Sequence, residues 1–143
     1  MKVRELVKKY EDQIIAWRRE FHENPELSWE EVRTGNRTCE ELTKMNIELK
    51  RIAKTGVLGI LKGDKPGKTV ALRADIDALP VKEANNVFYK SKNEGVMHAC
   101  GHDGHIAMLL GAAKILSLMK DEVEGTIIFI FSRQKKWARV LPK

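Results

Sequence analysis

Apolar residues in the first part of the chain recur every three or four positions, with charged residues between them. This spacing is typical of one face of an amphipathic helix. Pro25 ends the pattern, because a proline disfavours helical geometry in the residue before it. A core-facing helix is favoured over a coiled-coil seam, since the pattern fills only one helix. The members of the stripe are Val3, Val7, Tyr10, Ile14, Trp17 and Phe21.

A second helix is predicted to start at Ser28, because Ser28 and Glu31 have the spacing of a capping box. Asn46 suits a left-handed residue just past the end of this helix. Cys39 lies on the apolar side and is therefore interpreted as a core residue. The apolar side consists of Val32, Cys39, Leu42 and Met45.

The pattern then changes to that of strands. Residues 47–53 alternate between apolar and polar, residues 57–61 form a short apolar run, and residues 69–74 form another. Thr55-Gly56 and the Asp-Lys-Pro-Gly sequence at 64–67 favour turns between these strands. Residues 80–97 are predicted to form a loop.

A third helix is predicted from about Asp103 to Lys120, with Asp103 capping its first turn. Its apolar face consists of Met108, Leu109, Ala112, Ile115, Leu116 and Met119. The apolar run at 126–131 suits a strand that is buried on both faces. Helices, then strands, then a helix and a strand indicate an α/β layered domain. Ligands in such domains gather at the carboxyl ends of strands.

Composition agrees with a single globular domain. The chain has 143 residues, of which 43% are hydrophobic and 32% charged, so it is long enough to bury a sizeable core. No apolar run reaches the length of a membrane span, and no signal-peptide core is found at the N-terminus. A cytoplasmic protein without a membrane partner is therefore expected. Cys39 and Cys100 are too far apart in sequence to suggest a disulfide framework.

Five of the six net positive charges belong to the last twelve residues. Residues 132–143 carry five basic side chains and no acidic one, whereas residues 1–131 carry 21 basic and 20 acidic side chains. A basic protein that binds nucleic acid normally spreads its charge over a face of the fold. The nearly neutral body of this chain therefore argues against a nucleic-acid partner.

Potential metal ligands are concentrated between His98 and His105, a stretch with the sequence His-Ala-Cys-Gly-His-Asp-Gly-His. Cys100 and His102 flank Gly101, a residue that permits a tight turn and lets both side chains aim at one point. A thiolate and an imidazole suit zinc and neighbouring divalent metals. The alternative is a small apolar cysteine and solvated histidines. Zinc prefers four ligands, and the stretch supplies two strong candidates.

Asp75 and Asp77 follow the predicted strand at 69–74. Acidic residues in this position are often simple turn residues. Alternatively, one of them receives a hydrogen bond from a metal-bound histidine, or helps to hold the metal itself. The sequence spacing does not choose between these roles.

Three motifs in this order resemble the metal-dependent amidohydrolase family that includes aminoacylase, hippurate hydrolase and the plant auxin-conjugate hydrolases. The resemblance covers residues 1 to about 131. The motifs are Arg18-Arg19-Glu20-Phe21-His22 followed by Pro25-Glu26-Leu27-Ser28, then Ala71-Leu72-Arg73-Ala74-Asp75-Ile76-Asp77-Ala78-Leu79-Pro80, and finally Gly95-Val96-Met97-His98-Ala99-Cys100-Gly101-His102-Asp103.

The resemblance implies a fold, a reaction and a set of site residues. The fold would be an incomplete three-layer, zinc-exopeptidase-like catalytic domain with a mixed sheet and flanking helices. The reaction would be hydrolysis of the amide bond of small N-acyl amino acids with two divalent ions, such as Mn, Zn, Co or Ni. Cys100 and His102 would be metal ligands and Asp77 a supporting carboxylate. Asp75 replaces a histidine ligand of related branches and is left without an assigned role, as is His105.

The resemblance breaks after Phe131, where the family continues Gln-Pro-Ala-Glu-Glu and this chain continues Ser-Arg-Gln-Lys-Lys-Trp. Codons AGC CGG CAG AAG AAG TGG after a C give the family motif when translated one nucleotide earlier, as CAG CCG GCA GAA GAA GTG. We therefore predict a frameshift that makes residues 132–143 a basic, non-family tail. By the resemblance, the general-base glutamate lies in the missing motif, so this chain is expected to be inactive. The alternative function is a non-catalytic metal-binding or interaction fragment. An open edge or apolar face at the strand ending at Phe131 would favour self-association.

Overall fold

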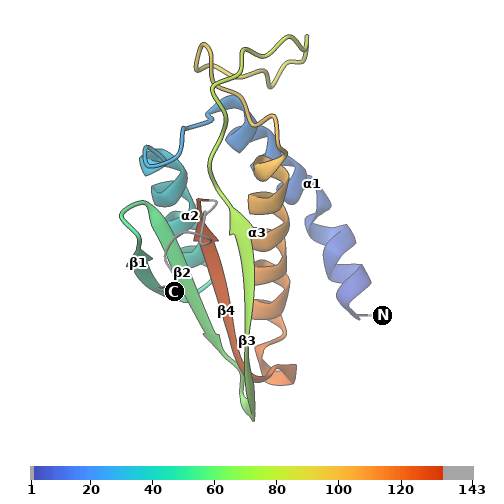
Figure 1. Cartoon of the computed structure of the whole chain (residues 1–143). Helices are drawn as coiled ribbons and strands as arrows, with labels where there is room; N and C mark the ends of the chain where they lie inside the picture. Colours follow the sequence, from blue (N-terminus) through green and yellow to red (C-terminus); the bar gives the residue numbers. More distant parts are fainter. Residues whose placement is uncertain (1, 134–143) are drawn as a thin grey trace.

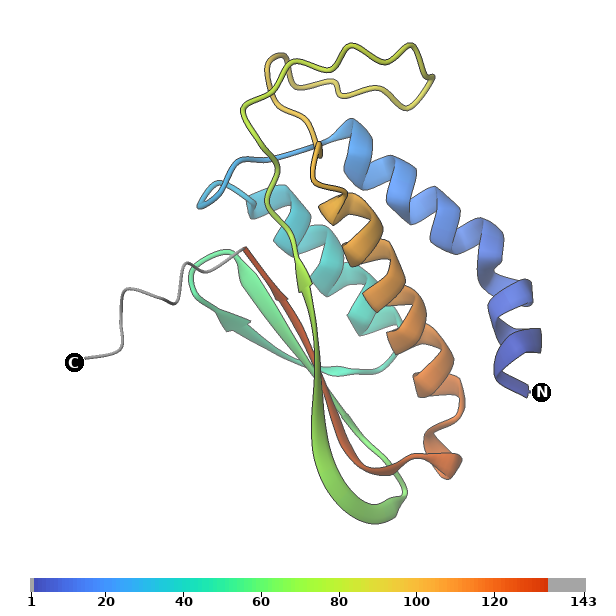
Figure 2. The same ribbon diagram turned by 45° about the vertical axis from the view of Figure 1, so that its right-hand side comes forward.

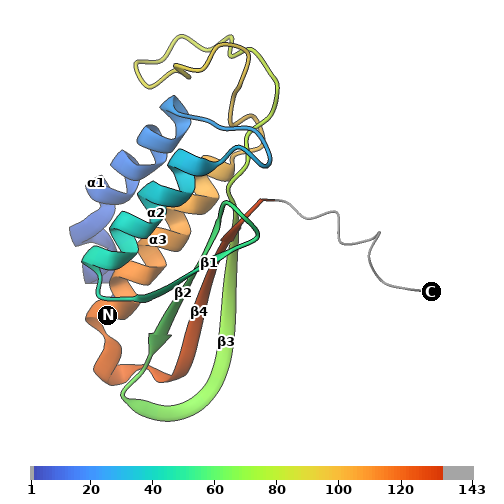
Figure 3. The ribbon, with the colours of Figure 1, turned by 90° about the vertical axis from the view of Figure 1, so that its left-hand side faces the viewer.

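The computed structural model describes residues 2–133 of the chain. Three helices lie on one face of a four-stranded sheet, and the opposite face carries no helix from this part of the chain (Figures 1 and 3). None of the described helices is long and apolar enough to cross a bilayer. The elements in chain order are α1 (Lys2–Glu23), α2 (Val32–Lys44), β1 (Glu48–Ile52), β2 (Gly56–Lys62), β3 (Lys65–Asp75), α3 (His102–Leu118), the short 3-10 helix η1 (Lys120–Glu122) and β4 (Glu124–Ser132).

The sheet is mixed, as predicted, with the strand order β1-β2-β4-β3. The β1–β2 and β2–β4 pairs are antiparallel, and the β3–β4 pair is parallel. A parallel pair needs a crossover connection, and α3 lies within the one that joins β3 to β4. Asp75 pairs with Ser132, so the parallel strands β3 and β4 have their carboxyl ends side by side.

The core lies between the helices and the sheet. Phe129 and Phe131 of β4 are fully buried, and so are Leu42 of α2 and Leu110 of α3. The apolar stripe of α1 contributes only in its second half, because Trp17 and Phe21 are buried, whereas Val3 and Val7 are 48% and 43% exposed. The other buried apolar residues of the cluster are Met45, Ile47, Val57, Leu61, Ala74, Ile76, Ile106, Ala107, Leu109 and Ala113. Cys39 packs partly buried against this cluster, in agreement with its predicted core position.

The predicted capping box at Ser28 is wrong. Helix α2 begins at Val32 with Glu31 as its N-cap residue, and Glu31 makes no capping hydrogen bond with its side chain. The carboxylate of Glu26 instead accepts the backbone N–H of Thr34 at 2.6 Å and that of Arg33 at 3.1 Å. It also accepts the hydroxyl of Thr34 at 2.7 Å. A side chain from outside the helix thus satisfies the free N–H groups of its first turn.

The predicted chain reversals are found with shifted boundaries. Asn46 has a φ of 56°, as expected for the left-handed residue past the end of α2. The turn between β1 and β2 centres on Ala53 and Lys54, which have φ values of 48° and 71°, so it precedes the predicted Thr55-Gly56 turn. Strand β3 already begins at Lys65, with an irregular register up to Thr69, and is longer than expected.

The strand that ends at Phe131 has no open edge, contrary to one prediction. Strand β4 is paired on both sides, and β1 and β3 form the edges of the described sheet. Its helix-free face is apolar but half-exposed, since Ile128 and Ile130 alternate with the buried Phe129 and Phe131. The expectation of burial on both faces is therefore wrong for residues 2–133, whereas the predicted apolar face is present.

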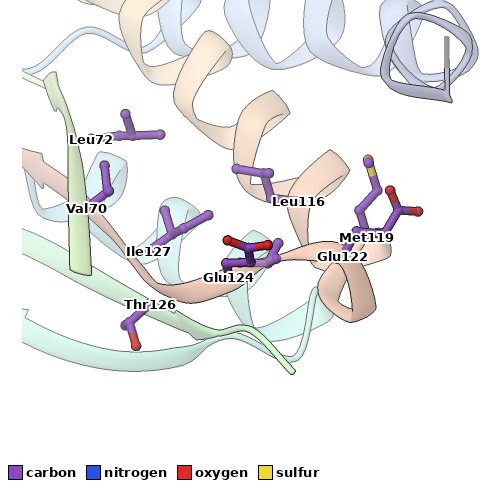
Figure 4. Close-up of a pocket in the computed structure, with 9 residues that line it drawn as sticks. Val70, Leu72, Leu116, Met119, Glu122, Glu124, Thr126 and Ile127 are labelled. Atoms are coloured by element: carbon purple, nitrogen blue, oxygen red, sulfur yellow. The ribbon is translucent and has the colours of Figure 1, made fainter. Parts of the chain in front are cut away.

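A shallow apolar groove lies beside the edge strand β3. Val70 and Leu72 of β3 face Leu116 of α3 and Ile127 of β4 across this groove (Figure 4). Helix α3 does not cover the edge strand completely, and Val70 remains 54% exposed.

Candidate metal centre

The candidate site lies where β3 ends and α3 begins. Strand β3 ends at Asp75, and the chain continues through the buried residues Ile76 and Asp77. Helix α3 starts at His102, directly after Gly101, whose φ of 80° lies in the left-handed region that glycine adopts without strain. The glycine turn predicted between Cys100 and His102 is therefore present. The carboxyl end of a strand and the start of a helix meet here, where α/β sheets bind ligands.

His102 is held in a defined orientation by Asp77. The Nδ1 atom of His102 lies 2.8 Å from the backbone carbonyl oxygen of Asp77 and 3.3 Å from its Oδ1. Both partners are oxygen acceptors, so Nδ1 is the nitrogen that donates a proton. The Nε2 atom is then left with a free lone pair, which is the arrangement of a metal-binding histidine.

Asp75 and His105 lie beside this free nitrogen. One ligand atom each from Asp75, His102 and His105 lie within 4.8 Å of one another. The Oδ2 atom of Asp75 is 3.8 Å from Nε2 of His102, and the rings of His102 and His105 stack with centroids 5.4 Å apart. Arg73 Nη2 lies 2.8 Å from the other oxygen of Asp75, an ion pair that is not aligned as a hydrogen bond. Two imidazoles and a carboxylate are ligands that suit zinc and similar divalent ions.

Cys100 lies in the same turn with an exposed side chain. Its sulfur does not belong to the convergent group of Asp75, His102 and His105 among residues 2–133. The structure therefore brings His102 and Asp77 together and places Asp75 and His105 beside them. The ligand role of Cys100 stays a prediction.

His98 is a buried histidine without a hydrogen-bond partner. It is 3% exposed, and neither ring nitrogen makes a hydrogen bond in the described part of the chain. Burial lowers the pKa of His98 to about 4, although the neighbouring carboxylate of Asp103 acts in the opposite direction. His98 is therefore an uncharged imidazole at neutral pH.

A cluster of buried charged residues lies behind the turn. The Nδ1 atom of His22 is 2.8 Å from Oδ2 of Asp103, and its Nε2 atom is 2.8 Å from Oε1 of Glu83. Arg18 reaches the same oxygen of Asp103 with its Nε atom at 2.9 Å. Asp103 thus contacts α1 rather than capping its own helix, contrary to the prediction. The i, i+4 spacing places Arg18 and His22 on one face of α1, but it does not indicate their distant partners.

Glu83 is held in its ionised form. Burial by itself raises the pKa of Glu83, but hydrogen bonds from the backbone N–H of Ser91 and from His22 more than offset burial. The pKa of Glu83 therefore lies below its ordinary value.

The chain is similar to known metal-dependent hydrolases. Residues 71–134 match the sequence model of peptidase family M20/M25/M40. Over these residues the chain is similar to this family. It is 48% identical over 135 residues to an N-acyl-L-amino acid amidohydrolase of Geobacillus stearothermophilus, an alignment that covers 94% of this chain and 36% of that protein. It is 54% identical over 132 residues to thermostable carboxypeptidase 2 of Saccharolobus solfataricus, with 91% of this chain and 34% of that protein covered. The chain thus spans about a third of the length of these relatives.

Solved structures confirm the fold class. A dinuclear metal-binding peptidase of the M20 family from Bacillus subtilis superimposes with a TM-score of 0.86 at 42% identity, covering 92% of this chain and 37% of that one. A zinc-dependent exopeptidase from Parabacteroides distasonis has the same fold, with a TM-score of 0.59 at 15% identity and coverage of 92% and 50%. The chain therefore has a zinc-exopeptidase-like α/β fold and is similar to a family of metal-dependent hydrolases. The imidazole and carboxylate groups where β3 ends and α3 begins are chemically suited to the divalent metal that this similarity implies.

Proposed function

We propose that this chain is the N-terminal, metal-binding portion of an amidohydrolase that acts on small N-acyl amino acids. The main support is the similarity to the N-acyl-L-amino acid amidohydrolase of Geobacillus stearothermophilus along 94% of this chain. Relatives named as an IAA-amino acid hydrolase and an N-acetylcysteine deacetylase support the same substrate class. The metal-type side chains at the end of β3 agree with this proposal.

The residues of this chain would hold and orient a divalent metal. Cys100 and His102 are the proposed ligands, and Asp77 fixes the ring of His102 so that Nε2 is available. Asp75 and His105 lie next to that nitrogen and are candidates for the same ion. A bound divalent ion supplies Lewis-acid chemistry for amide hydrolysis.

We propose further that this chain does not hydrolyse such substrates by itself. No acidic residue follows Glu124, so the glutamate pair that the family resemblance calls for is not among its residues. Without a general base the reaction loses about 10²- to 10⁴-fold in rate. A non-catalytic metal-binding fragment is the alternative, and it is supported by the same ligand-type residues.

Cobalt binding tests the metal site. Titration with Co²⁺ should give visible absorption bands and a near-ultraviolet thiolate-to-cobalt band. Cys100→Ala should abolish the thiolate band, whereas Cys39→Ala, the matched control in α2, should leave it unchanged. Binding without a thiolate band, lost in Asp75→Asn, would show that Asp75, His102 and His105 are the ligands and that the role of Cys100 is wrong. A chain that binds no Co²⁺ would contradict the proposed metal site.

Residues 132–143 are the subject of a separate proposal. We propose that they are translated out of frame, because the codons AGC CGG CAG AAG AAG TGG encode the family motif when they are read one nucleotide earlier. Sequencing of the DNA beyond the codon for Phe131 tests this directly, and a shifted frame without a family-like sequence would refute it. A protein expressed in the restored frame should hydrolyse N-acetyl or N-benzoyl amino acids with added Mn²⁺ or Zn²⁺, whereas the present chain should not.

Self-association through the sheet is also proposed. It is supported by the half-exposed Ile128 and Ile130 and by the exposed Val70 and Leu72 on the edge strand. Sedimentation should show a mass that rises with protein concentration. A monomer at all concentrations would contradict the proposal.

A further inference from the structure

The buried charged cluster behind the turn has no part in the proposed metal chemistry. We call it the His22 clamp, consisting of His22, Glu83, Asp103 and Arg18. Its members come from α1, from the loop 80–97 and from the first turn of α3. His22 connects the other elements, because one ring nitrogen meets Asp103 and the other meets Glu83, each at 2.8 Å.

The clamp is buried too deeply to be an ordinary surface ion pair. His22, Glu83 and Asp103 are only 3%, 4% and 1% exposed. Buried carboxylates are costly unless hydrogen bonds and charges compensate them. The ring of His22 provides such a partner for both carboxylates, so removing it would leave Glu83 and Asp103 with fewer donors in a buried environment.

The two carboxylates of the clamp lie on either side, in sequence, of the turn at residues 98–102, which carries Cys100 and His102. Asp103 directly follows His102, so its contact with His22 fixes the first turn of α3 against α1. Glu83 lies in the loop that leads into the turn and also accepts the backbone N–H of Ser91 at 2.6 Å. The turn at residues 98–102 is thus anchored from both sides to one ring.

Other contacts reinforce the loop arm. The loop 80–97 arches over the end of α1 (Figure 2), where the N–H of Lys92 donates to the carbonyl oxygen of Glu23 at 2.8 Å. Tyr89 places its ring edge-on to His22, with centroids 5.4 Å apart, and Arg18 lies over the same tyrosine. The loop therefore docks on the helix turn that carries His22.

We infer that His22 is a positioning residue that fixes the geometry of the turn carrying Cys100 and His102. The part of the inference that concerns metal affinity rests on the proposed function. The inference also gives a role to the first sequence motif, Arg18 to His22, which the metal chemistry leaves unused. Partners that orient metal ligands typically change metal affinity by about 10- to 100-fold when they are removed.

Three variants separate positioning from stability. His22→Leu removes both ring nitrogens, and His22→Gln keeps an amide N–H that can donate to one of the two carboxylates. Thr55→Val is the control, because Thr55 donates to the buried Glu31 at 2.7 Å and its loss also strips a buried carboxylate of a partner. Thr55 precedes β2, which β4 separates from β3 in the sheet.

Amide hydrogen exchange of the metal-free protein is the first measurement. In His22→Leu we expect the Ser91 and Gly101 amides, which donate to Glu83 and to the His98 carbonyl, to exchange at least tenfold faster relative to the core amide of Phe129. Thr55→Val should leave this ratio unchanged. An unchanged ratio in His22→Leu, or the same change in Thr55→Val, would overturn the inference.

Cobalt affinity is the second measurement. His22→Leu should weaken Co²⁺ binding about 10- to 100-fold, with an altered absorption spectrum, and His22→Gln should restore part of the loss. Affinity and spectrum that stay unchanged in His22→Leu would refute the positioning role. If the unsubstituted chain binds no Co²⁺, the proposed metal site fails, while the exchange ratio still decides whether His22 holds the turn.

A further variant covers the case in which His22→Leu does not fold. Glu83→Met changes only the loop arm and removes both carboxylate oxygens, which are the partners of His22 and of the Ser91 N–H. The Ser91 and Met97 amides should then exchange faster relative to Phe129. Equal protection of these amides in Glu83→Met and the unsubstituted chain would overturn the inference.

Discussion

Replacement of Glu26 should destabilise the chain, although Glu26 lies outside the helix that it stabilises. Its carboxylate accepts three hydrogen bonds, two from Thr34 and one from the backbone of Arg33, at the start of α2. Loss of an N-terminal cap costs about 0.5–2 kcal/mol. Loss of a negative charge near a helix N-terminus costs about 0.3–1 kcal/mol. Thr34 is fully buried, so its donors would also be left unsatisfied.

These contributions overlap, and we expect Glu26→Ala to lower the free energy of unfolding by about 2–3 kcal/mol. For a chain of this size the melting temperature should fall by roughly 8–12 °C. Glu26→Gln keeps an acceptor oxygen and loses the charge, so its effect should be about 1 kcal/mol. Urea unfolding, followed by far-ultraviolet circular dichroism, gives the free energy of unfolding of the unsubstituted chain, Glu26→Ala and Glu26→Gln.

Ser28→Ala is the critical comparison. The sequence pattern assigns the capping role to Ser28, but this residue is exposed and precedes α2 by four positions. Its replacement should change the free energy of unfolding by less than about 0.5 kcal/mol. If Ser28→Ala destabilised the chain as much as Glu26→Ala, the structural assignment of the cap would be refuted.

Two further predictions concern the turn. Unfolding of the chain raises the pKa of His98 from about 4 to its ordinary 6.5, so the unfolded state binds more protons between these pH values. The free energy of unfolding should therefore fall by up to about 3 kcal/mol as the pH drops from 6.5 to 4. In chelator-treated protein, His98→Asn should reduce this loss. If His98→Asn and the unsubstituted chain showed the same dependence of stability on pH, His98 would not be the titrating group. Gly101→Ala should cost about 1 kcal/mol, because φ is 80° and an added Cβ meets nothing within 4 Å. Gly104→Ala, within α3, should instead stabilise by about 0.5–1 kcal/mol, and equal effects of the two substitutions in thermal unfolding would refute this explanation.

Local patterns were sufficient for most of the fold. The 3.6-residue period located α1, and the short apolar runs located the strands, because these signals depend on near neighbours in sequence. The prediction of the capping residue of α2 was wrong. Ser28 and Glu31 have the spacing of a capping box, but the actual cap is Glu26, which reaches the helix because the segment after Pro25 folds back. The central position of β4 also depends on tertiary pairing that periodicity does not specify.

The site was predictable only where its residues are adjacent in sequence. Cys100 and His102 stand out because two metal-type side chains flank one glycine. Asp75 and His105 are thirty positions apart in sequence, and they come together only because the end of β3 lies beside the start of α3. His22 meets Glu83 and Asp103 over separations of 61 and 81 residues, so no local pattern could reveal that contact.

The central place of β4 has a consequence for biosynthesis. Strand β4, between β2 and β3, is the last of the four to leave the ribosome, so the edges of β2 and β3 that it occupies stay unpaired until residue 132 has emerged. Long-range pairing of this kind is slow and leaves apolar segments open to aggregation. Chaperone dependence during translation should therefore be greatest just before the final strand is inserted.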